Sequence, residues 1–118
     1  MTQTLKLGDI WLANLNPTRG TEMGKTRPVL VLQSQVLLDI EHPSTLIVPL
    51  TTNLVNDAYP LRIRIKAKDK LKKDSDLIID QLRAIDNKRL TEGPLASLDK
   101  NELKDVFAAV FDVVGMTL

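Results

Sequence analysis

Five polar residues of this sequence form the set best suited to hold a phosphate group: Glu22, Arg27, Thr51, Asp80 and Gln81. Lys25 adds a cation two residues before Arg27. Arginine presents planar, permanently charged donors that match phosphate oxygens, and a threonine hydroxyl can donate to a further oxygen. Glu22 lies in a loop between Gly20 and Gly24, which lets that loop close over a ligand. Taken singly, each residue also has an ordinary interpretation, because a strand-start arginine most often forms a surface ion pair and a loop glutamate is most often solvated.

The sequence offers little for metal or nucleophile chemistry. Its single histidine, His42, lies in the segment EHPS, where a lone histidine is usually just exposed, and there is no cysteine. No carboxylates stand at the spacing of metal ligands, and neither a phosphate-binding glycine loop nor a nucleophile elbow is present. We therefore expect a protein that uses no metal and no cofactor.

Two short apolar segments must position Arg27 and Thr51. The proline that follows Arg27 favours extended backbone there, and residues 29–33 are expected to form a strand. Residues 45–50 predict another strand, which tolerates Pro49 only at an edge or at its end. If these strands are antiparallel neighbours, the start of one meets the end of the other, so the guanidinium and the hydroxyl meet at one rim.

Apolar residues at alternate positions predict further strands. The clearest pattern spans residues 61–66, where Leu61, Ile63 and Ile65 alternate with two arginines and a lysine and leave one basic face. Residues 10–15 carry apolar side chains on both faces, which indicates a strand buried on much of both sides. Shorter segments predict strands at 77–79 and 82–85 and a helical turn at 34–39, whereas 90–95 is ambiguous because it contains Gly93-Pro94.

Helical periodicity replaces this alternation near the C-terminus. Asp99 and Glu102 have the spacing of a capping box, and Gly115 is placed to end the helix. The apolar residues between them recur at helical intervals: Leu103, Val106, Phe107, Val110 and Val114. The fold class is therefore mainly β, with five or more short strands in a curled barrel closed by a C-terminal amphipathic helix. Phe111 and Val113 widen the apolar surface of that helix, which fits either a dimer interface or one helix covering its own core.

Composition limits the classes of protein that remain. The 118 residues fit one domain spanning residues 1–118, and an apolar content of 43% is enough for a core. The net charge is only +1, so nucleic-acid binding would rest on a local patch such as residues 62–73, which hold seven cations. The ordinary interpretation of that run is a solvated hairpin. No signal peptide, transmembrane run or cysteine is present, which favours a cytoplasmic protein with no membrane contact.

Three segments, covering roughly Leu7 to Val114, resemble in order and spacing the motifs of the MazF/PemK toxins of bacterial type II toxin–antitoxin modules: GDIWLANLNPTRGTEMGKTRPVLVLQ, IVPLTT and IDQLRAIDNKRL. The resemblance implies an SH3-like barrel, a homodimer, and a ribosome-independent endoribonuclease that cuts single-stranded RNA at a short sequence. It also implies a cognate antitoxin that blocks the site with an acidic C-terminal segment. Any contact with operator DNA would be made only indirectly, through that antitoxin.

By position, the resemblance implies catalytic roles for Arg27, Thr51 and Glu22. The reaction would be attack of the ribose 2′-OH on the adjacent phosphate, without a metal, leaving a 2′,3′-cyclic phosphate and a 5′-OH. Arg27 and Thr51 would stabilise the developing charge, and Glu22 is the natural proton acceptor, since arginine keeps its proton in proteins. Contacts with RNA would come from the remaining matched or basic residues: Lys25, Thr21, Arg62, Arg64, Asp80 and Gln81.

The chain departs from some members of that family at two positions. Ile78 stands where some PemK-type members carry an arginine assigned as the general acid, so the general acid is unassigned in this chain. Thr21 stands where some relatives have a histidine before the loop glutamate. The sequence at which RNA would be cut therefore cannot be transferred to this chain.

Three other classes of protein compete with the nuclease interpretation. CcdB, a gyrase poison of similar fold class, acts through its extreme C-terminus and a tryptophan near it, whereas this chain ends VVGMTL and has its only tryptophan at position 11. A degenerate relative that only binds antitoxin or nucleic acid is disfavoured by intact Glu22, Arg27 and Thr51, although Ile78 leaves room for it. An SH3-like peptide binder needs an aromatic groove, for which an aromatic content of 3% is poor.

Overall fold

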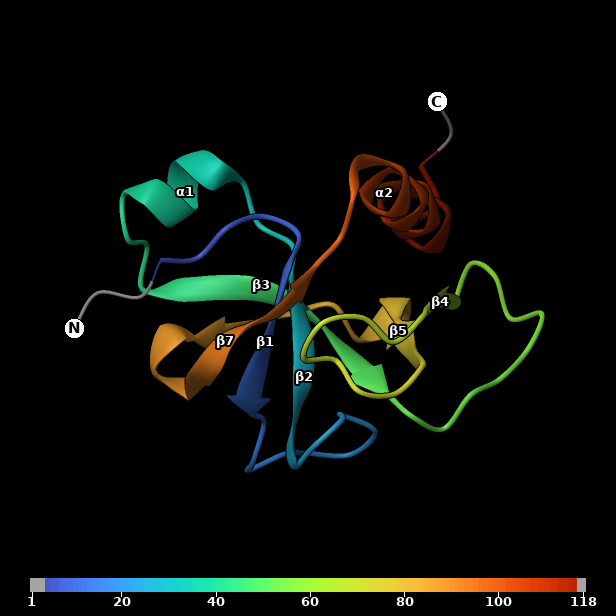
Figure 1. Cartoon of the computed structure of the whole chain (residues 1–118), viewed down its shortest axis with the longest axis horizontal. Helices are drawn as coiled ribbons and strands as arrows, with labels where there is room; N and C mark the ends of the chain where they lie inside the picture. Colours follow the sequence, from blue (N-terminus) through green and yellow to red (C-terminus); the bar gives the residue numbers. More distant parts are fainter. Residues whose placement is uncertain (1–3, 117–118) are drawn as a thin grey trace.

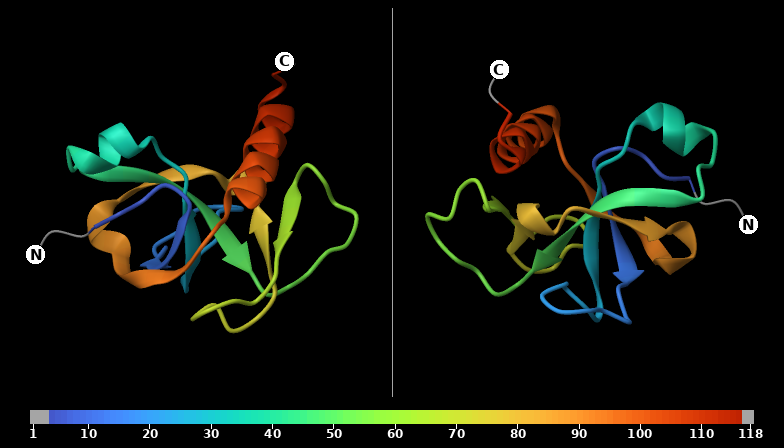
Figure 2. Two further views of the ribbon diagram at one scale, coloured as in Figure 1. Left: turned by 45° about the horizontal axis from the view of Figure 1, so that its top comes forward. Right: turned by 180° about the vertical axis from the view of Figure 1, so that it is seen from behind.

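The computed structural model describes residues 4–116 and is built around a sheet of seven antiparallel strands in that part of the chain (Figure 1). The strands are β1 (Asp9–Asn14), β2 (Thr26–Val31), β3 (Ser44–Thr51), β4 (Arg62–Ile65), β5 (Ser75–Ile78), β6 (Arg83–Asp86) and β7 (Leu90–Ser97). They run in the order β4-β5-β3-β2-β1-β7, and β6 also pairs with β3. The mainly β, barrel-like fold with a C-terminal helix is thus confirmed. The sheet curls, as both views of Figure 2 show, but no ladder in the described residues joins β4 to β7.

Strand β3 is the centre of the sheet because it pairs with three other strands. One edge lies along β2, and the other pairs with β6 as far as Ile47 and with β5 from Leu50 onward. Pro49 lies between these two ladders and pairs with neither β5 nor β6. The expectation that Pro49 requires an edge or a strand end was therefore wrong. A gap between ladders serves the same purpose, since no hydrogen bond from the proline nitrogen is needed there.

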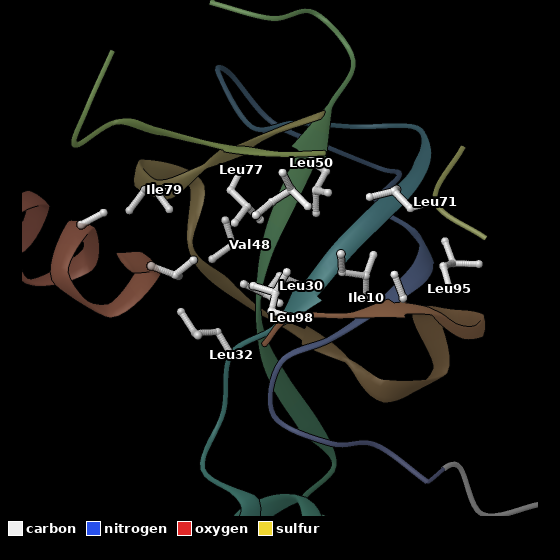
Figure 3. Packing of buried hydrophobic residues seen from close by; sticks show 14 residues of the cluster. Ile10, Leu30, Leu32, Val48, Leu50, Leu71, Leu77, Ile79, Leu95 and Leu98 are labelled. Atoms are coloured by element: carbon white, nitrogen blue, oxygen red, sulfur yellow. The ribbon is translucent and has the colours of Figure 1, made fainter. Parts of the chain in front are cut away.

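Two apolar cores lie on opposite faces of β1. The side chain of Ile10 belongs to the core drawn in Figure 3, together with Leu30, Val48, Leu50 and Leu77. The next residue, Trp11, belongs to a second core that includes Ala13, Leu15, Val29 and Ile47. The alternation predicted for residues 10–15 is therefore confirmed, and β1 is buried on both faces as its composition indicated.

Helix α2 (Lys100–Val114) covers the first core and has the predicted ends. The Asp99 carboxylate accepts a hydrogen bond from the Glu102 amide at 2.8 Å, and the Glu102 carboxylate accepts one from the Asp99 amide at 3.0 Å. Gly115 ends the helix in the left-handed conformation, with φ of 81°, which glycine adopts without a Cβ penalty. Val106 and Ala109 are buried, and the helix packs against β4 and the 3₁₀ turn η1 (Ile79–Gln81).

The shorter elements differ from their predicted ends for local reasons. Strand β2 begins three residues earlier than expected and stops at Val31, because the side chain of Gln33 takes over pairing with β3. Its amide oxygen accepts from the Leu46 amide and its nitrogen donates to the Ser44 carbonyl. Ile79 was predicted to end a strand but begins η1, whereas the ambiguous segment 90–95 belongs to β7.

The remaining short elements are the helix α1 (Gln35–Asp39), where a helical turn was predicted, and the 3₁₀ turn η2 (Asn87–Arg89). Figure 1 shows α1 and α2 on one side of the sheet and the loop between β1 and β2 on the other. Between residues 4 and 116, no helix is both long and apolar enough to cross a membrane.

Candidate functional site

A pocket of about 560 Å³ opens where β2 begins and β3 ends. Three segments line it, residues 25–28, 50–53 and 70–75 (all but Asp74), together with Leu95 of β7. Arg27 and Thr51 both lie on its wall. The strand register explains why they meet: Val29 pairs with Pro49 in the antiparallel ladder, so Arg27 falls opposite Thr51 when that register is continued. The predicted meeting of these two residues at one rim is confirmed.

The guanidinium of Arg27 is held by backbone carbonyls and not by an acid. Its Nε donates to the Gly24 oxygen at 2.7 Å, and a terminal nitrogen donates to the Leu50 oxygen at 3.3 Å. Burial lowers the pKa of Arg27 from its ordinary value, although an arginine still keeps its proton in proteins. No carboxylate in the described part of the chain forms an ion pair with it. The pocket therefore contains a fixed cation whose charge is not neutralised, which suits an anionic ligand.

Thr51 is the last residue of β3, and its hydroxyl has a defined orientation. The Oγ1 atom accepts a hydrogen bond from the Asn53 amide at 3.1 Å, in a local turn. Because this bond uses the oxygen as acceptor, the hydroxyl proton is left to donate, and within residues 4–116 no acceptor for it is present. Because Thr51 lines the basic pocket, its hydroxyl is available to donate to a phosphate oxygen bound there.

Four lysines extend the positive charge of the pocket: Lys25, Lys70, Lys72 and Lys73. Lys25 was predicted to contact RNA, whereas the other three belong to the run 62–73, for which a solvated hairpin was the ordinary interpretation. Leu71, only 4% exposed, anchors their loop in the first core, and the Lys70 amide donates to the Leu95 oxygen at 2.9 Å. None of these three lysines has an ion pair among the described residues. The loop therefore presents uncompensated cations on a fixed backbone.

Arg62 and Arg64 do not line this pocket, because a buried carboxylate holds both. Asp76 of β5 is 1% exposed and accepts from Arg64 Nε at 2.8 Å and from a terminal nitrogen of Arg62 at 3.4 Å. Burial by itself would raise the pKa of Asp76, but the hydrogen bonds from Arg64 and the Val55 amide and the two positive charges outweigh it and lower that pKa. The same hydrogen bond raises the pKa of Arg64. These arginines line a separate hollow of about 430 Å³, so their predicted contact with RNA stays a prediction.

Glu22 and Thr21 lie in the loop between β1 and β2, and neither lines the pocket. The Glu22 carboxylate accepts from the Arg19 amide at 2.8 Å and lies 3.7 Å from a terminal nitrogen of Arg83. The base of the loop is fixed, since the Lys25 amide donates to Asn16 Oδ1 at 2.9 Å. Glu22 therefore lies outside the lining of the pocket and contacts the Arg19 amide and Arg83.

Asp80 and Gln81 lie in η1, which packs beside α2. Asp80 is exposed and Gln81 is half-buried, and neither lines the pocket. Of the nine residues predicted for the site, the structure thus brings together Arg27, Thr51 and Lys25.

Two polar residues that the sequence did not single out are structurally prominent. Asp76 stands opposite Arg64 in the β4–β5 register, so the alternation of both strands would have paired them once the register was known. Arg83 of β6 is half-buried, and one terminal nitrogen has no hydrogen-bond acceptor in the described structure despite its ion pair with Glu22. Among residues 4–116, no three histidine, cysteine, aspartate or glutamate side chains cluster in a way that could hold a metal ion.

Known proteins are similar to this chain in sequence and in fold. Endoribonuclease MazF of Staphylococcus saprophyticus is 35% identical over 114 residues, which cover 95% of this chain and 92% of that protein. The crystal structure of MazF from Deinococcus radiodurans superposes with a TM-score of 0.81 at 22% identity, covering 97% of this chain and 99% of that one. The Mycobacterium tuberculosis toxin MazF-mt6 gives a TM-score of 0.76 at 19% identity, covering 93% and 99%.

A family model extends this similarity across the whole fold. Residues 6–114 match the model of the PemK-like, MazF-like toxin of type II toxin–antitoxin systems. This match includes all seven strands and α2, and so every residue that lines the basic pocket. The chain therefore belongs to the PemK-like, MazF-like family of toxins.

Proposed function

We propose that this chain is an endoribonuclease toxin that cuts single-stranded RNA at a short sequence, without the ribosome and without a metal ion. The observation that carries the proposal is the pocket in which Arg27 and Thr51 meet among four lysines, because this is a site for an extended polyanion. The relative from S. saprophyticus, which is 35% identical, is an endoribonuclease. Since messenger RNA is the substrate, the toxin acts in the cytoplasm.

The proposed reaction is an internal transfer at one phosphate. The ribose 2′-oxygen bonds to phosphorus while the bond from phosphorus to the 5′-oxygen breaks, which leaves a 2′,3′-cyclic phosphate and a 5′-OH. Negative charge grows on the non-bridging oxygens, where the Arg27 guanidinium and the Thr51 hydroxyl stabilise it. Both groups are held in place before the substrate binds, so little reorganisation is needed during the reaction.

Two proton transfers complete the proposed reaction. Glu22 accepts the 2′-OH proton after its loop moves from Arg83 toward the pocket, a shift that gives up the 3.7 Å ion pair with Arg83 for contact with the substrate. The leaving 5′-oxygen takes a proton from water, because Ile78, at the position of the acid in PemK-type members, is apolar and buried. Slow departure of the leaving group is the expected consequence.

The partners proposed for the toxin follow from the same surfaces. An acidic segment of a cognate antitoxin would cover the lysine-lined pocket and exclude RNA from it. Solved structures of MazE–MazF from D. radiodurans are complexes of related chains, superposing with a TM-score of 0.76 at 21% identity. A second copy of the toxin would pack on the apolar side chains that α2 leaves partly exposed: Phe107, Val110, Phe111, Val113 and Val114.

The purified protein should cut a mixed-sequence RNA in excess EDTA, and Arg27→Ala should abolish the cutting. Lys6→Ala is the matched control, because Lys6 is an exposed cation that does not line the pocket. Fragment ends should carry 2′,3′-cyclic phosphate, read by mass spectrometry. RNA left intact by the wild type would refute the nuclease proposal and favour a degenerate relative that only binds. Cutting that needs added metal would refute the mechanism.

A further inference from the structure

Asp76 is a buried carboxylate at the edge of the pocket, yet it faces away from the pocket itself. In the ladder between β3 and β5 it pairs with Thr51. Its oxygens accept from the Val55 amide at 2.9 Å, from Arg64 at 2.8 Å and from Arg62 at 3.4 Å. A carboxylate with 1% exposure and three donors is a fixed point in the fold, since removing it would leave two arginines without their partner.

A chain of hydrogen bonds connects this fixed point to Thr51. The same nitrogen of Arg62 that contacts Asp76 donates to the Asn53 carbonyl at 3.0 Å. The amide of Asn53 in turn donates to Thr51 Oγ1 at 3.1 Å. Asn53 lies on the pocket wall beside Thr51, so the chain ends where a phosphate would bind.

The segment that follows Thr51 has little else to hold it. Residues 52–57 are all exposed, and Figure 2 shows this segment extending away from the sheet before it returns to β4. Within it, the Val55 amide bonds directly to Asp76, and Asn56 Oδ1 accepts from Arg64 at 2.8 Å. Asp76 and its two arginines therefore fix the segment at residues 53, 55 and 56, without any contribution from a buried apolar side chain there.

We propose that Asp76 is a positioning residue for RNA cleavage, which acts through Arg62 and the backbone of Asn53 to hold the Thr51 hydroxyl as a donor aimed into the pocket. The inference rests on the proposed nuclease function. Asp76 touches no substrate, and its contribution passes entirely through Thr51. In this scheme the principal task of Arg62 is to link Asp76 to Asn53.

A double-mutant cycle tests this route. Asp76→Asn keeps the shape of the side chain but removes its charge and turns an amide NH₂ toward the arginines. It should lower kcat/KM by about 10- to 100-fold, because a misplaced catalytic donor costs this much, with most of the loss in kcat. In a Thr51→Ala background the same change should cost less than about twofold, because residues acting as one unit are not additive.

Asp9→Asn provides the matched control. Asp9 is also a buried carboxylate and accepts a hydrogen bond from Ser97 Oγ at 2.6 Å, but neither residue lines the pocket. Its substitution should cost stability in urea without lowering kcat, which separates general destabilisation from positioning. Arg62→Gln should repeat the Asp76→Asn pattern. A loss of equal size in the wild-type and Thr51→Ala backgrounds would overturn the inference, since Asp76 or Arg62 would then act on folding or on RNA directly.

Amide hydrogen exchange tests the positioning route without measuring catalysis. In Asp76→Asn the amides of Asn53 and Val55 should lose protection, while those of Leu30 and Val48 in the sheet core keep theirs. Unchanged protection at Asn53 would overturn the positioning route even if activity fell. If the wild type cuts RNA but the losses from Asp76→Asn and Thr51→Ala are additive, only this inference is refuted. If the wild type leaves RNA intact, the proposed function is refuted.

Discussion

The three lysines at positions 70, 72 and 73 should set the salt dependence of RNA binding. Their joint replacement by glutamine removes charge without disturbing the backbone, because Leu71 and the Lys70–Leu95 hydrogen bond anchor the loop independently of the lysine side chains. Five cations line the pocket, namely these three with Lys25 and Arg27, so the triple variant keeps two of five. The magnitude follows from the release of counterions from RNA.

Each phosphate neutralised on a single strand contributes about −0.7 to the slope of log K against log salt. If each cation meets one phosphate, the slope should be about −3.5 for the wild type and about −1.4 for the triple variant. Raising salt from about 50 to about 200 mM should then weaken wild-type binding by about 100-fold and variant binding by about 7-fold. The difference is large enough to measure with a simple titration.

The assay is fluorescence anisotropy on an RNA that carries 2′-deoxyribose at the mapped cleavage position, so that binding is observed without cutting. A control triple variant replaces Lys6, Lys100 and Lys104, which are exposed and lie outside the pocket, and changes net charge by the same amount. Equal slopes for the wild type and the pocket variant would refute the reasoning, as would an equal change in the control. Cleavage positions should stay the same, because phosphate contacts position a strand without reading its sequence.

Three further predictions concern stability. Gly93→Ala should destabilise the fold by about 1–3 kcal/mol in urea unfolding, because a Cβ there would overlap the Trp11 indole ring. If the variant unfolds at the same urea concentration as the wild type, the ring can shift to make room. Asp99→Ala should lower the free energy of unfolding by about 1 kcal/mol, because it removes the capping box with Glu102. Asp99→Asn should largely retain this cap, so equal losses for the two variants would contradict a capping role. The pKa of Asp76 is lower in the folded than in the unfolded chain, so unfolding binds a proton and stability falls as pH drops through the acidic range. Between pH 7 and pH 3 the wild type should therefore lose more stability than Asp76→Asn, and parallel pH profiles would contradict this.

The sequence predicted the meeting of Arg27 and Thr51 on the condition that their strands are antiparallel neighbours, and the reason is physical. Pro28 favours extended backbone at Arg27, apolar runs define both strands, and antiparallel pairing then leaves little freedom in where their ends meet. The ends of α2 were equally predictable, because the capping box and Gly115 are local signals that do not depend on the rest of the fold.

The different partners of the cations in residues 62–73 could not be predicted, because they depend on contacts between segments that are distant in the sequence. Arg62 and Arg64 bind Asp76 across the β4–β5 register, and Lys68 pairs with Glu102 of α2. The three lysines at 70, 72 and 73 line the same pocket as Arg27. A linear sequence does not contain these distances. For the same reason the direction of Glu22 was open: a loop flanked by glycines permits several conformations, and the ion pair with Arg83 selects one.

The break in pairing at Pro49 places the pocket at a junction between two ladders of the sheet. Arg27 belongs to the ladder of β1, β2 and β3, whereas the three lysines and Asp76 belong to the β4–β5 hairpin, whose strand pairing with that ladder runs through the last residues of β3. A hairpin of different length or sequence would alter the cationic wall while leaving the strand that carries Arg27 as it is. One scaffold could therefore keep Arg27 in place, and keep the hairpin residues that position Thr51, while the lysine loop that meets the RNA strand diversifies.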